Sequence, residues 1–491
     1  MLPPAIPIQP ISHPLSASVR VPGSKSLTNR ALMVAALADG TTRLTNALFS
    51  DDSRYFAESL VQLGFEVHLE PEADDGKEHR DGKDHRDGNL PSRWSSDRAV
   101  GRLSLARRAS PAFARLCTPL PSMTVTGLAG RIPAEQADLY IGNAGTAARF
   151  LTAMLTLGFG NYTLDGDDRM RQRPMQDLLG ALEQLGAVIT NSESRGQSIG
   201  ADDRNTHLPI CVQARGLPGG QADIAGDASS QFLSGLLMAA PYAQHPVELR
   251  VERGLTSKPF VDMTLAVMAN FGVHVERDGY DRFIVTPQIY HSPGAYAIES
   301  DATAASYFFI APVICGGTVR VEGITRRSKQ GDVAFLDILA QMGCTVAEGP
   351  NWVSVTGPQG DPTLSSLHGV TVDMMDIPDT AQTLAAVAPF ACTPTTIRGI
   401  ASARLKETDR VAALCAELSR LGVVVKEYPD GLTIYPCRDF HPAAVQTYND
   451  HRMAMAFSMI GLKVPGITIL DPGCVSKTFP GFYEVLAQLQ K

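Results

Sequence analysis

The chain contains six segments in which small apolar residues follow a short polar start, a pattern typical of buried helices. The segments read PGSKSLTNRALMVAALA, GNAGTAARFLTAML, GDASSQFLSGLLMAA, SDATAASYFFIAPV, PDTAQTLAAVAPF and NDHRMAMAFSMIGL. A β-like stretch follows each one, with hydrophobic anchors at Leu44, Leu164, Val251, Val321, Ile397 and Leu470. Units that recur about every 70 to 80 residues indicate one supersecondary motif used six times.

A second helix follows in each unit, after a charged loop. These helices begin within DDSRYFAESLVQLGF, MQDLLGALEQLGA, FVDMTLAVMANFG, GDVAFLDILAQMG, ETDRVAALCAELSRLG and FPGFYEVLAQLQK. In the fifth, Val411, Leu414, Cys415 and Leu418 have the spacing of one apolar helix face. Short apolar strands come next, so the chain is predicted to be an α/β protein. Six units divide most simply into two domains of three.

A segment near residues 74–115 interrupts the first unit. It opens with DGKEHR DGKDHR and continues into a stretch rich in Arg and Ser. Such a composition buries too little apolar surface to offset the entropy of ordering, so we expect a disordered insertion. His79 and His85 lie in this solvated run and do not indicate a metal site. Contact between the basic stretch 93–115 and an acidic partner stays open as an alternative.

Composition narrows the function classes. Of the 491 residues, 44% are hydrophobic and 19% are charged, as in soluble globular proteins, and no apolar run is long enough for a membrane span. The N-terminus lacks a signal-peptide pattern, so a cytoplasmic location is expected. The eight cysteines include no CxxC pair, which favours reduced thiols. A net charge of −8 argues against a nucleic-acid partner.

The polar helix starts carry the candidate chemistry, because a helix N-terminus attracts anions. Lys25, Ser26 and Arg30 open the first helix, but the residue before the lysine is Ser24, which excludes a P-loop. The second start carries Asn143, Gly145, Thr146 and Arg149, and the third carries Ser229, Ser230 and Gln231. Taken alone, each of these starts is better explained as a solvated helix end or an N-cap.

The fifth and sixth units add a denser set of charges. Lys406 and Arg410 are spaced for one helix face, with Glu407 beside them. Asn449–Arg452 opens the last helix, and Lys477 follows the last strand. Such clusters are usually solvated. Because these cations recur at equivalent points of the units, we expect them to converge where the helix starts converge.

Ten motifs in this order resemble one family, the 3-phosphoshikimate 1-carboxyvinyltransferases. They are PGSKSLTNRAL, GNAGTAARF, RMRQRP, GDASSQF, SKPFVDMT, QGD, IPDTAQT, RLKETDR, YNDHRMAM and DPGCVSKTFP. The resemblance implies two domains, each of three βαβαββ repeats around a pseudo-threefold axis (an inside-out α/β barrel), with the active site in the cleft between them. It places one domain at 23–298 and the other at 1–22 plus 299–491.

The resemblance also implies the reaction: transfer of the enolpyruvyl group of phosphoenolpyruvate to the 5-hydroxyl of shikimate 3-phosphate, with release of phosphate. The resemblance implies no cofactor and no metal, and it implies that the protein is a monomer. The residues implied for shikimate 3-phosphate are Lys25, Ser26, Arg30, Ser229, Ser230, Gln231, Ser257, Asp379, Ser402 and Lys406. Those implied for phosphoenolpyruvate are Lys25, Asn143, Gly145, Thr146, Arg173, Gln231, Arg410, Arg452 and Lys477.

Asp379, Glu407 and Lys25 are the catalytic candidates in an addition–elimination reaction. Asp379 is expected to take the proton of the 5-hydroxyl, although a lone Asp at a helix start is ordinarily only an N-cap. Glu407 is expected to donate and later accept the proton at C3 of the enol, with Lys25 sharing that work. Retention of Gly145 predicts inhibition by glyphosate, a ligand of the phosphoenolpyruvate site.

Three positions depart from the family pattern, and two alternatives stay open. Phe260 stands where a Tyr is common, Ser402 where many relatives have Asn, and Phe150 where many bacterial relatives have Pro. One alternative is UDP-N-acetylglucosamine enolpyruvyl transferase, which shares the fold and uses a reactive loop cysteine; Cys117 is the residue to consider for it. The other is a non-catalytic anion-binding protein on the same scaffold.

Overall fold

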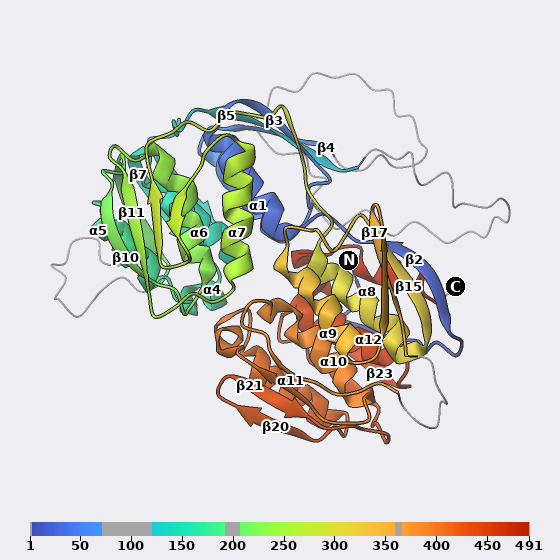
Figure 1. Cartoon of the computed structure of the whole chain (residues 1–491). Helices are drawn as coiled ribbons and strands as arrows, with labels where there is room; N and C mark the ends of the chain where they lie inside the picture. The colour runs from blue at the N-terminus through green and yellow to red at the C-terminus, as the bar shows by residue number, and fades with distance from the viewer. Residues whose placement is uncertain (1, 71–119, 192–206, 359–365, 491) are drawn as a thin grey trace.

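The computed structural model describes residues 2–70, 120–191, 207–358 and 366–490, and in these ranges the chain forms six small sheets around two groups of helices (Figure 1). The predicted insertion at 74–115 and Cys117 lie outside the described residues. Each helix in these ranges is too short or too polar to serve as a membrane span.

The six helices predicted from small apolar residues form the centres of the two groups. They are α1 (Lys25–Leu37), α3 (Gly145–Leu155) and α6 (Ser230–Ala239) in one group, and α8 (Ala302–Cys315), α10 (Ala381–Val387) and α12 (His451–Gly461) in the other. In the first group α3 contacts both α1 and α6, and in the second group the three helices contact one another. Residues 302–314 of α8 are all buried, which explains why it lacks a polar face.

The second helix of each unit packs outside this centre. These helices are α2 (Asp51–Gln62), α5 (Gln176–Gln184), α7 (Lys258–Asn270), α9 (Phe335–Gln341), α11 (Arg410–Arg420) and α13 (Phe482–Leu486), joined by the short α4 (Asp168–Gln172). On α11 the predicted apolar face, Val411 to Leu418, is buried.

Three sheets surround the first group of helices. Their strand orders are β14 (Ala295–Ala297), β3 (Asp39–Thr45), β5 (Ser122–Leu128), β4 (Glu66–Glu70); β6 (Gln136–Tyr140), β7 (Phe159–Asp165), β9 (Ile210–Arg215), β8 (Ile189–Asn191); and β10 (Gly220–Ala225), β11 (Val247–Glu252), β13 (Arg282–Val285), β12 (Glu276–Asp278). In each sheet the first two strands are parallel and the other neighbours antiparallel.

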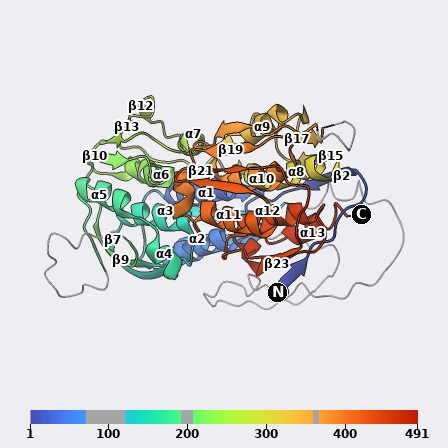
Figure 2. The same cartoon turned by 90° about the horizontal axis from the view of Figure 1, so that it is seen from below.

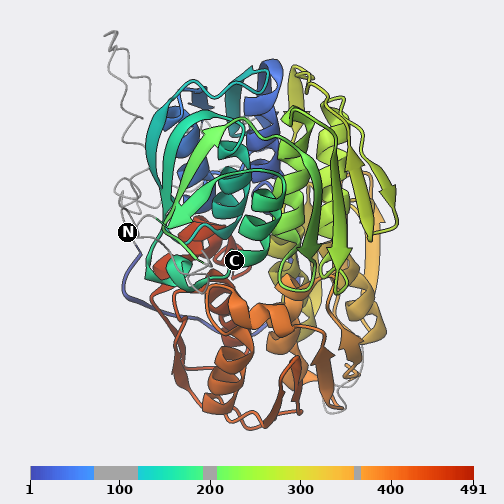
Figure 3. The same cartoon turned by 90° about the vertical axis from the view of Figure 1, so that its left-hand side faces the viewer.

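Three sheets surround the second group in the same way. Their orders are β2 (Leu15–Arg20), β15 (Gly317–Glu322), β17 (Trp352–Thr356), β16 (Thr345–Gly349); β18 (Thr371–Asp373), β19 (Thr395–Arg398), β21 (Gly431–Ile434), β20 (Val425–Tyr428); and β22 (Ala443–Val445), β23 (Ile467–Leu470), β1 (Ala5–Pro7). The sheets lie outside and the helices inside, and Figure 3 shows the first group above the orange and red second group.

Two strands are supplied from far along the chain. The blue strand β2 lies parallel to β15 (Figure 2), and β14 completes the sheet of the first unit. The two connections that follow run side by side, because Gly23 pairs with Ser300 and Ser24 N–H donates to Glu299 O at 2.8 Å. A Cβ at Gly23 would lie 1.8 Å from Asn46 O, so only glycine fits at this crossing.

The described residues have two hydrophobic cores. One is formed by side chains between Leu27 and Ile298, and the other by side chains from Ile8 to Val21 together with those from Ala302 to Leu489. The α/β class predicted from the sequence is confirmed. The polar starts of the central helices face the junction between the two cores, where the candidate site lies.

Candidate active site

Asp379 lies at the centre of a cluster of cations in the second group of helices. It belongs to the 3₁₀ turn Pro378–Thr380 that precedes α10. Its Oδ1 is 2.8 Å from Lys406 Nζ and 3.1 Å from Arg410 Nη1, and its Oδ2 is 2.8 Å from Arg452 Nη2. Burial opposes ionisation of Asp379, but Arg452, Lys406 and Arg410 outweigh it and hold the pKa of the carboxyl well below its ordinary value. The group is therefore a carboxylate.

Arg410 links this carboxylate to two others. Its Nε is 2.8 Å from Asp450 Oδ2, and its Nη2 is 2.7 Å from Glu407 Oε2. Burial opposes the charge of Arg410, yet Asp450, Glu407 and Asp379 raise its pKa above the ordinary value. Burial likewise acts against ionised Glu407, but Arg410 and Arg173 hold its pKa well below the ordinary value. Both partners of this buried pair are charged.

Contacts with the first half of the chain complete the cluster. Lys477 Nζ donates to Asn143 O at 2.6 Å and lies 3.7 Å from Glu407 Oε1. Arg173 Nη1 donates to Asn143 Oδ1 at 3.0 Å and is 4.0 Å from that same Glu407 oxygen. The site thus joins residues of both cores.

Asp52, at the start of α2, forms ion pairs with two predicted cations. Its Oδ2 is 3.6 Å from Lys25 Nζ and its Oδ1 is 3.2 Å from Lys477 Nζ. A narrow cavity beside it is lined by Lys25, Ser26 and Arg452 among other residues. The structure therefore brings together the residues predicted from the first, second, fifth and sixth helix starts.

Gly145, the first residue of α3, lies directly against Arg173. A Cβ at this position would come 2.4 Å from Arg173 Nη2 and 2.7 Å from its Cζ. The glycine therefore sets how closely the guanidinium approaches the start of α3.

The predicted hydroxyl and amide residues lie around the cluster rather than in it. Ser229 caps α6 by accepting from Gln231 N–H, and the Gln231 side chain donates to Thr146 Oγ1 at 3.3 Å. Ser230 is buried at the start of α6. Ser257 has a left-handed backbone (φ 57°), and its N–H donates to Met375 O of the other core at 3.1 Å.

Arg30 is buried inside the first core. Its guanidinium donates to Thr264 Oγ1, Ser26 O, Ser234 Oγ and Phe260 O. It lies 5.3 Å from the ring centre of Phe150 and 5.9 Å from that of Phe260. Burial lowers its pKa to about 9. The two aromatic departures from the family pattern thus enclose the same cation, and the structure gives Arg30 no direct contact with the central cluster.

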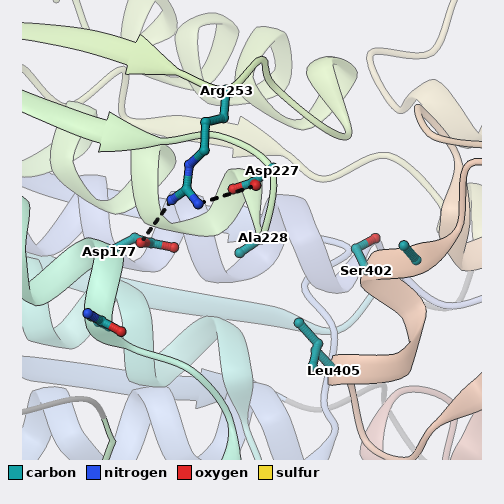
Figure 4. A pocket seen from close by; sticks show the side chains of 8 residues that line it. Asp177, Asp227, Ala228, Arg253, Ser402 and Leu405 are labelled. Atoms are coloured by element: carbon teal, nitrogen blue, oxygen red, sulfur yellow. Dashed lines mark ion pairs between the residues drawn. The ribbon is translucent and has the colours of Figure 1, made fainter. Parts of the chain in front are cut away.

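Ser402 lies apart from the cluster, at a cavity of about 420 Å³ between the two cores. Figure 4 shows Arg253 between Asp177 and Asp227 on one side of this cavity, with Ser402 and Leu405 on the other. Both ion pairs of Arg253 measure 3.7 Å. The cavity is wide enough to admit a small molecule.

Sequence reasoning missed three carboxylates. Asp301, at the start of the fourth central helix, accepts from Lys25 N–H through Oδ2 at 3.0 Å. Asp52 and Asp450 were not singled out either. Asp301 and Asp450 also cap their own helices, and a cap gives no sign of a further partner. The repeated helix starts were the available signal.

No group of three or more His, Cys, Asp or Glu side chains among the described residues is arranged to hold a metal ion. The expected absence of a metal and of a cofactor stays a prediction.

Comparisons with known proteins give one consistent result. A family model described as EPSP synthase (3-phosphoshikimate 1-carboxyvinyltransferase) matches residues 10–89 and 120–486. The protein named 3-phosphoshikimate 1-carboxyvinyltransferase from Nostoc punctiforme is 43% identical over 484 residues, 99% of each chain, and that from Marinomonas sp. is 41% identical over 98% of each. Among solved structures, EPSP synthase from Acinetobacter baumannii superposes with a TM-score of 0.72 at 23% identity, covering 99% of this chain and 98% of that one.

Proposed function

The chain belongs to the EPSP synthase (3-phosphoshikimate 1-carboxyvinyltransferase) family, and from this premise we propose how the site between its two cores acts on its substrates. The enzyme transfers the enolpyruvyl group of phosphoenolpyruvate to the 5-hydroxyl of shikimate 3-phosphate and releases phosphate, a step of the shikimate pathway to the aromatic amino acids. Its fold is the inside-out α/β barrel of that family.

One observation carries the proposal for the site: its cations outnumber its carboxylates. Lys25, Arg173, Lys406, Arg410, Arg452 and Lys477 face Asp52, Asp301, Asp379, Glu407 and Asp450. Each substrate carries a phosphate and a carboxylate, and the two substrates repel each other unless cations neutralise them. An excess of fixed positive charge between two cores supplies that neutralisation.

For phosphoenolpyruvate we propose the cations nearest the junction. Arg410 and Arg452 would hold one of its anionic groups, and Arg173, Lys477 and Lys25 the other. Donors beside them complete the set: Asn143, Gly145, Thr146 and Gln231.

For shikimate 3-phosphate we propose the neighbouring hydroxyls and Lys406. Ser229, Ser230, Gln231 and Ser257 lie at two helix starts of the first core, where backbone N–H groups add to their hydroxyls and amide. Lys25, Ser26, Asp379 and Ser402 belong to the same proposed set. Arg30 stays in it as well, but its guanidinium bonds support a role in holding Ser26 and Phe260 in place.

The proposed chemistry uses the two central carboxylates. Asp379 accepts the proton of the 5-hydroxyl while that oxygen bonds to C2 of phosphoenolpyruvate, and C3 gains a proton from Glu407, with Lys25 in support. The tetrahedral adduct then expels phosphate, which takes up the proton released by Asp379, while C3 returns a proton to Glu407. Atoms and charge balance without an external oxidant or reductant.

The low pKa values of Asp379 and Glu407 affect this proposed scheme. A carboxylate whose pKa is held low by three cations is a weak base. When substrate anions bind to Arg410 and Arg452, they draw these cations from Asp379, and its pKa rises toward its ordinary value. The pKa of Glu407 must also rise toward its ordinary value before this carboxylate can carry a proton. Substrate binding thus activates both groups.

Three further statements belong to the proposal. The two hydrophobic cores support domain limits at 23–298 and at 1–22 plus 299–491. We also propose a monomer and a cytoplasmic location, with small-molecule substrates as the only partners needed for activity.

Phosphate release tests the function directly. We expect release only when phosphoenolpyruvate and shikimate 3-phosphate are both present. Release with UDP-N-acetylglucosamine as the acceptor would favour the alternative transferase. Binding of either substrate without any release would favour a binding protein.

A further inference from the structure

Arg169, on α4, reaches from the first core to the backbone of two residues of the proposed site. Its Nε donates to Lys406 O at 3.0 Å and to Glu407 O at 3.1 Å, and its Nη2 donates to Lys406 O at 2.7 Å. α4 itself is held in place, because Asp167 accepts from Met170 N–H through its side chain at 2.8 Å and donates from its own N–H to Gly142 O at 3.1 Å.

The segment that Arg169 contacts has little support of its own. Residues 406–408 connect the 3₁₀ turn Ala401–Leu405 to α11 and belong to neither. Within the described part of the chain, no backbone N–H donates to the carbonyls of Lys406 or Glu407. The bonds from Arg169 therefore fix the direction of both peptide groups.

The side chains on these two peptide groups are central to the site. Lys406 Nζ is 2.8 Å from Asp379 and Glu407 Oε2 is 2.7 Å from Arg410. Arg173, four residues after Arg169, approaches the Glu407 carboxylate at 4.0 Å. The short helix α4 and the residue that follows it thus contact both the main chain and the side chain of Glu407.

We propose that Arg169 is a positioning residue that holds the Lys406–Glu407 backbone across the junction and so places the Lys406 ammonium and the Glu407 carboxylate in their working positions. This inference rests on the proposed function for its kinetic consequences. The planar guanidinium suits the role because its fork can donate to two adjacent carbonyls, whereas a lysine ammonium is a single point donor.

The test compares Arg169→Met and Arg169→Lys with Arg171→Met. Arg171 lies on the same helix, but its side chain pairs with Asp165 of its own half. For Arg169→Met we expect kcat to fall about tenfold or more, since small misplacements of reacting groups are costly. We expect KM for phosphoenolpyruvate to change by less than about threefold, because its cations remain. The kcat of Arg169→Lys is expected to lie between that of Arg169→Met and that of the original enzyme. The kcat of Arg171→Met is expected to stay within about twofold of the original value.

Two further readouts separate positioning from general stability. Solvent deuterium enters C3 of phosphoenolpyruvate when the adduct forms and reverts, and we expect this exchange to fall with kcat in Arg169→Met. Amide hydrogen exchange of residues 406–409 is expected to become faster in Arg169→Met and to stay unchanged in Arg171→Met.

The possible outcomes are distinct. A kcat within about twofold of the original in Arg169→Met, or an equal loss in Arg171→Met, would overturn the inference. Unchanged amide exchange at 406–409 would overturn it without reference to any activity. An unaltered enzyme that releases no phosphate from the two substrates would contradict the proposed function instead.

Discussion

Arg452 and Asp379 form an ion pair at the centre of the junction, with Nη2 of the arginine 2.8 Å from Oδ2 of the aspartate. The arginine is one of the proposed ligands of phosphoenolpyruvate, and the aspartate is the proposed base. In the absence of substrate each therefore satisfies the other. On the proposed assignment, substrate anions compete for the cation and release the base, so the ion pair would couple binding to activation.

Asp379→Asn is expected to abolish turnover while shikimate 3-phosphate still binds. The amide cannot accept the hydroxyl proton, and loss of a general base typically costs about 10²- to 10⁴-fold in rate. Lys406 and the serine hydroxyls are retained, so the binding constant measured by calorimetry should change little. Asp373→Asn, at an exposed carboxylate on β18, is the matched control and should keep normal turnover. Near-normal turnover in Asp379→Asn would remove this residue from the role of base.

The sequence predicted the fold because its signal is local. A helix such as α8, buried on every side, needs small apolar residues all round, and its segment SDATAASYFFIAPV has them. The pairing of the strands that complete these sheets could not be predicted from a local pattern. β2 pairs with β15 and β14 with β3, and no periodicity indicates pairing across such distances along the chain. The resemblance implied only the domain to which each of these strands belongs, and the pairings themselves were not predicted.

The candidate site was predictable where charge repeats with the fold. Lys25, Arg410 and Arg452 each follow a polar helix start, and the structure brings them to one junction. Asp301 and Asp450 were not predicted as site residues because each caps a helix with one oxygen and contacts a site residue with the other. Arg169 lies in the RMRQRP motif, but its role was not predicted because its partners across the junction are backbone carbonyls.

Gly145→Ala is expected to weaken phosphoenolpyruvate and glyphosate together. The new methyl group would lie 2.4 Å from Arg173 Nη2, the end of a flexible side chain, so the guanidinium moves and the fold survives. Displacing one charge-assisted anion contact should raise KM for phosphoenolpyruvate, and the inhibition constant of glyphosate, about tenfold.

Gly180→Ala is the control for this substitution. Gly180 lies within α5 with no atom within 4 Å of an added Cβ, so kinetics should be unchanged and stability should rise by about 0.5 to 1 kcal/mol. Glyphosate inhibition as strong in Gly145→Ala as in the original enzyme would contradict the place given to Arg173.

Deleting residues 74–115 is expected to leave kcat unchanged. The described strands on either side, β4 and β5, are antiparallel neighbours in which Glu70 pairs with Ser122, and Ser122 Oγ donates to Glu70 Oε2 at 2.7 Å. Residues 71–73 and 116–121 would remain, enough to connect two strands already side by side. Steady-state kinetics and a thermal melt check this. A loss of activity would assign the segment a function in catalysis.

A buried carboxyl near the site, Asp332, gives a prediction about pH. Thr303 donates to one of its oxygens, and the other has no partner among the described residues. Burial and the charge of Asp379 raise its pKa from 3.8 to about 6, with Asp301 adding to the rise, while the Thr303 hydrogen bond and Arg452 act the other way. The folded protein therefore holds this proton more tightly than the unfolded chain does.

Asp332→Asn is consequently expected to stabilise the protein at pH 8 and to have little effect at pH 4. Proton binding by Asp332 favours the folded state fully below pH 3.8, and this contribution is lost as the pH rises through about 6. Above that pH the original protein carries an unfavourable buried charge that costs up to about 3 kcal/mol, since one pKa unit corresponds to about 1.4 kcal/mol. The amide avoids this charge at every pH and can still accept from Thr303. Melting temperatures of the two proteins, compared at both pH values, check this. A variant less stable at pH 8 would show that Asp332 is ionised and stabilised by Arg452, and an equal shift at both pH values would show that ionisation of Asp332 does not cause the effect.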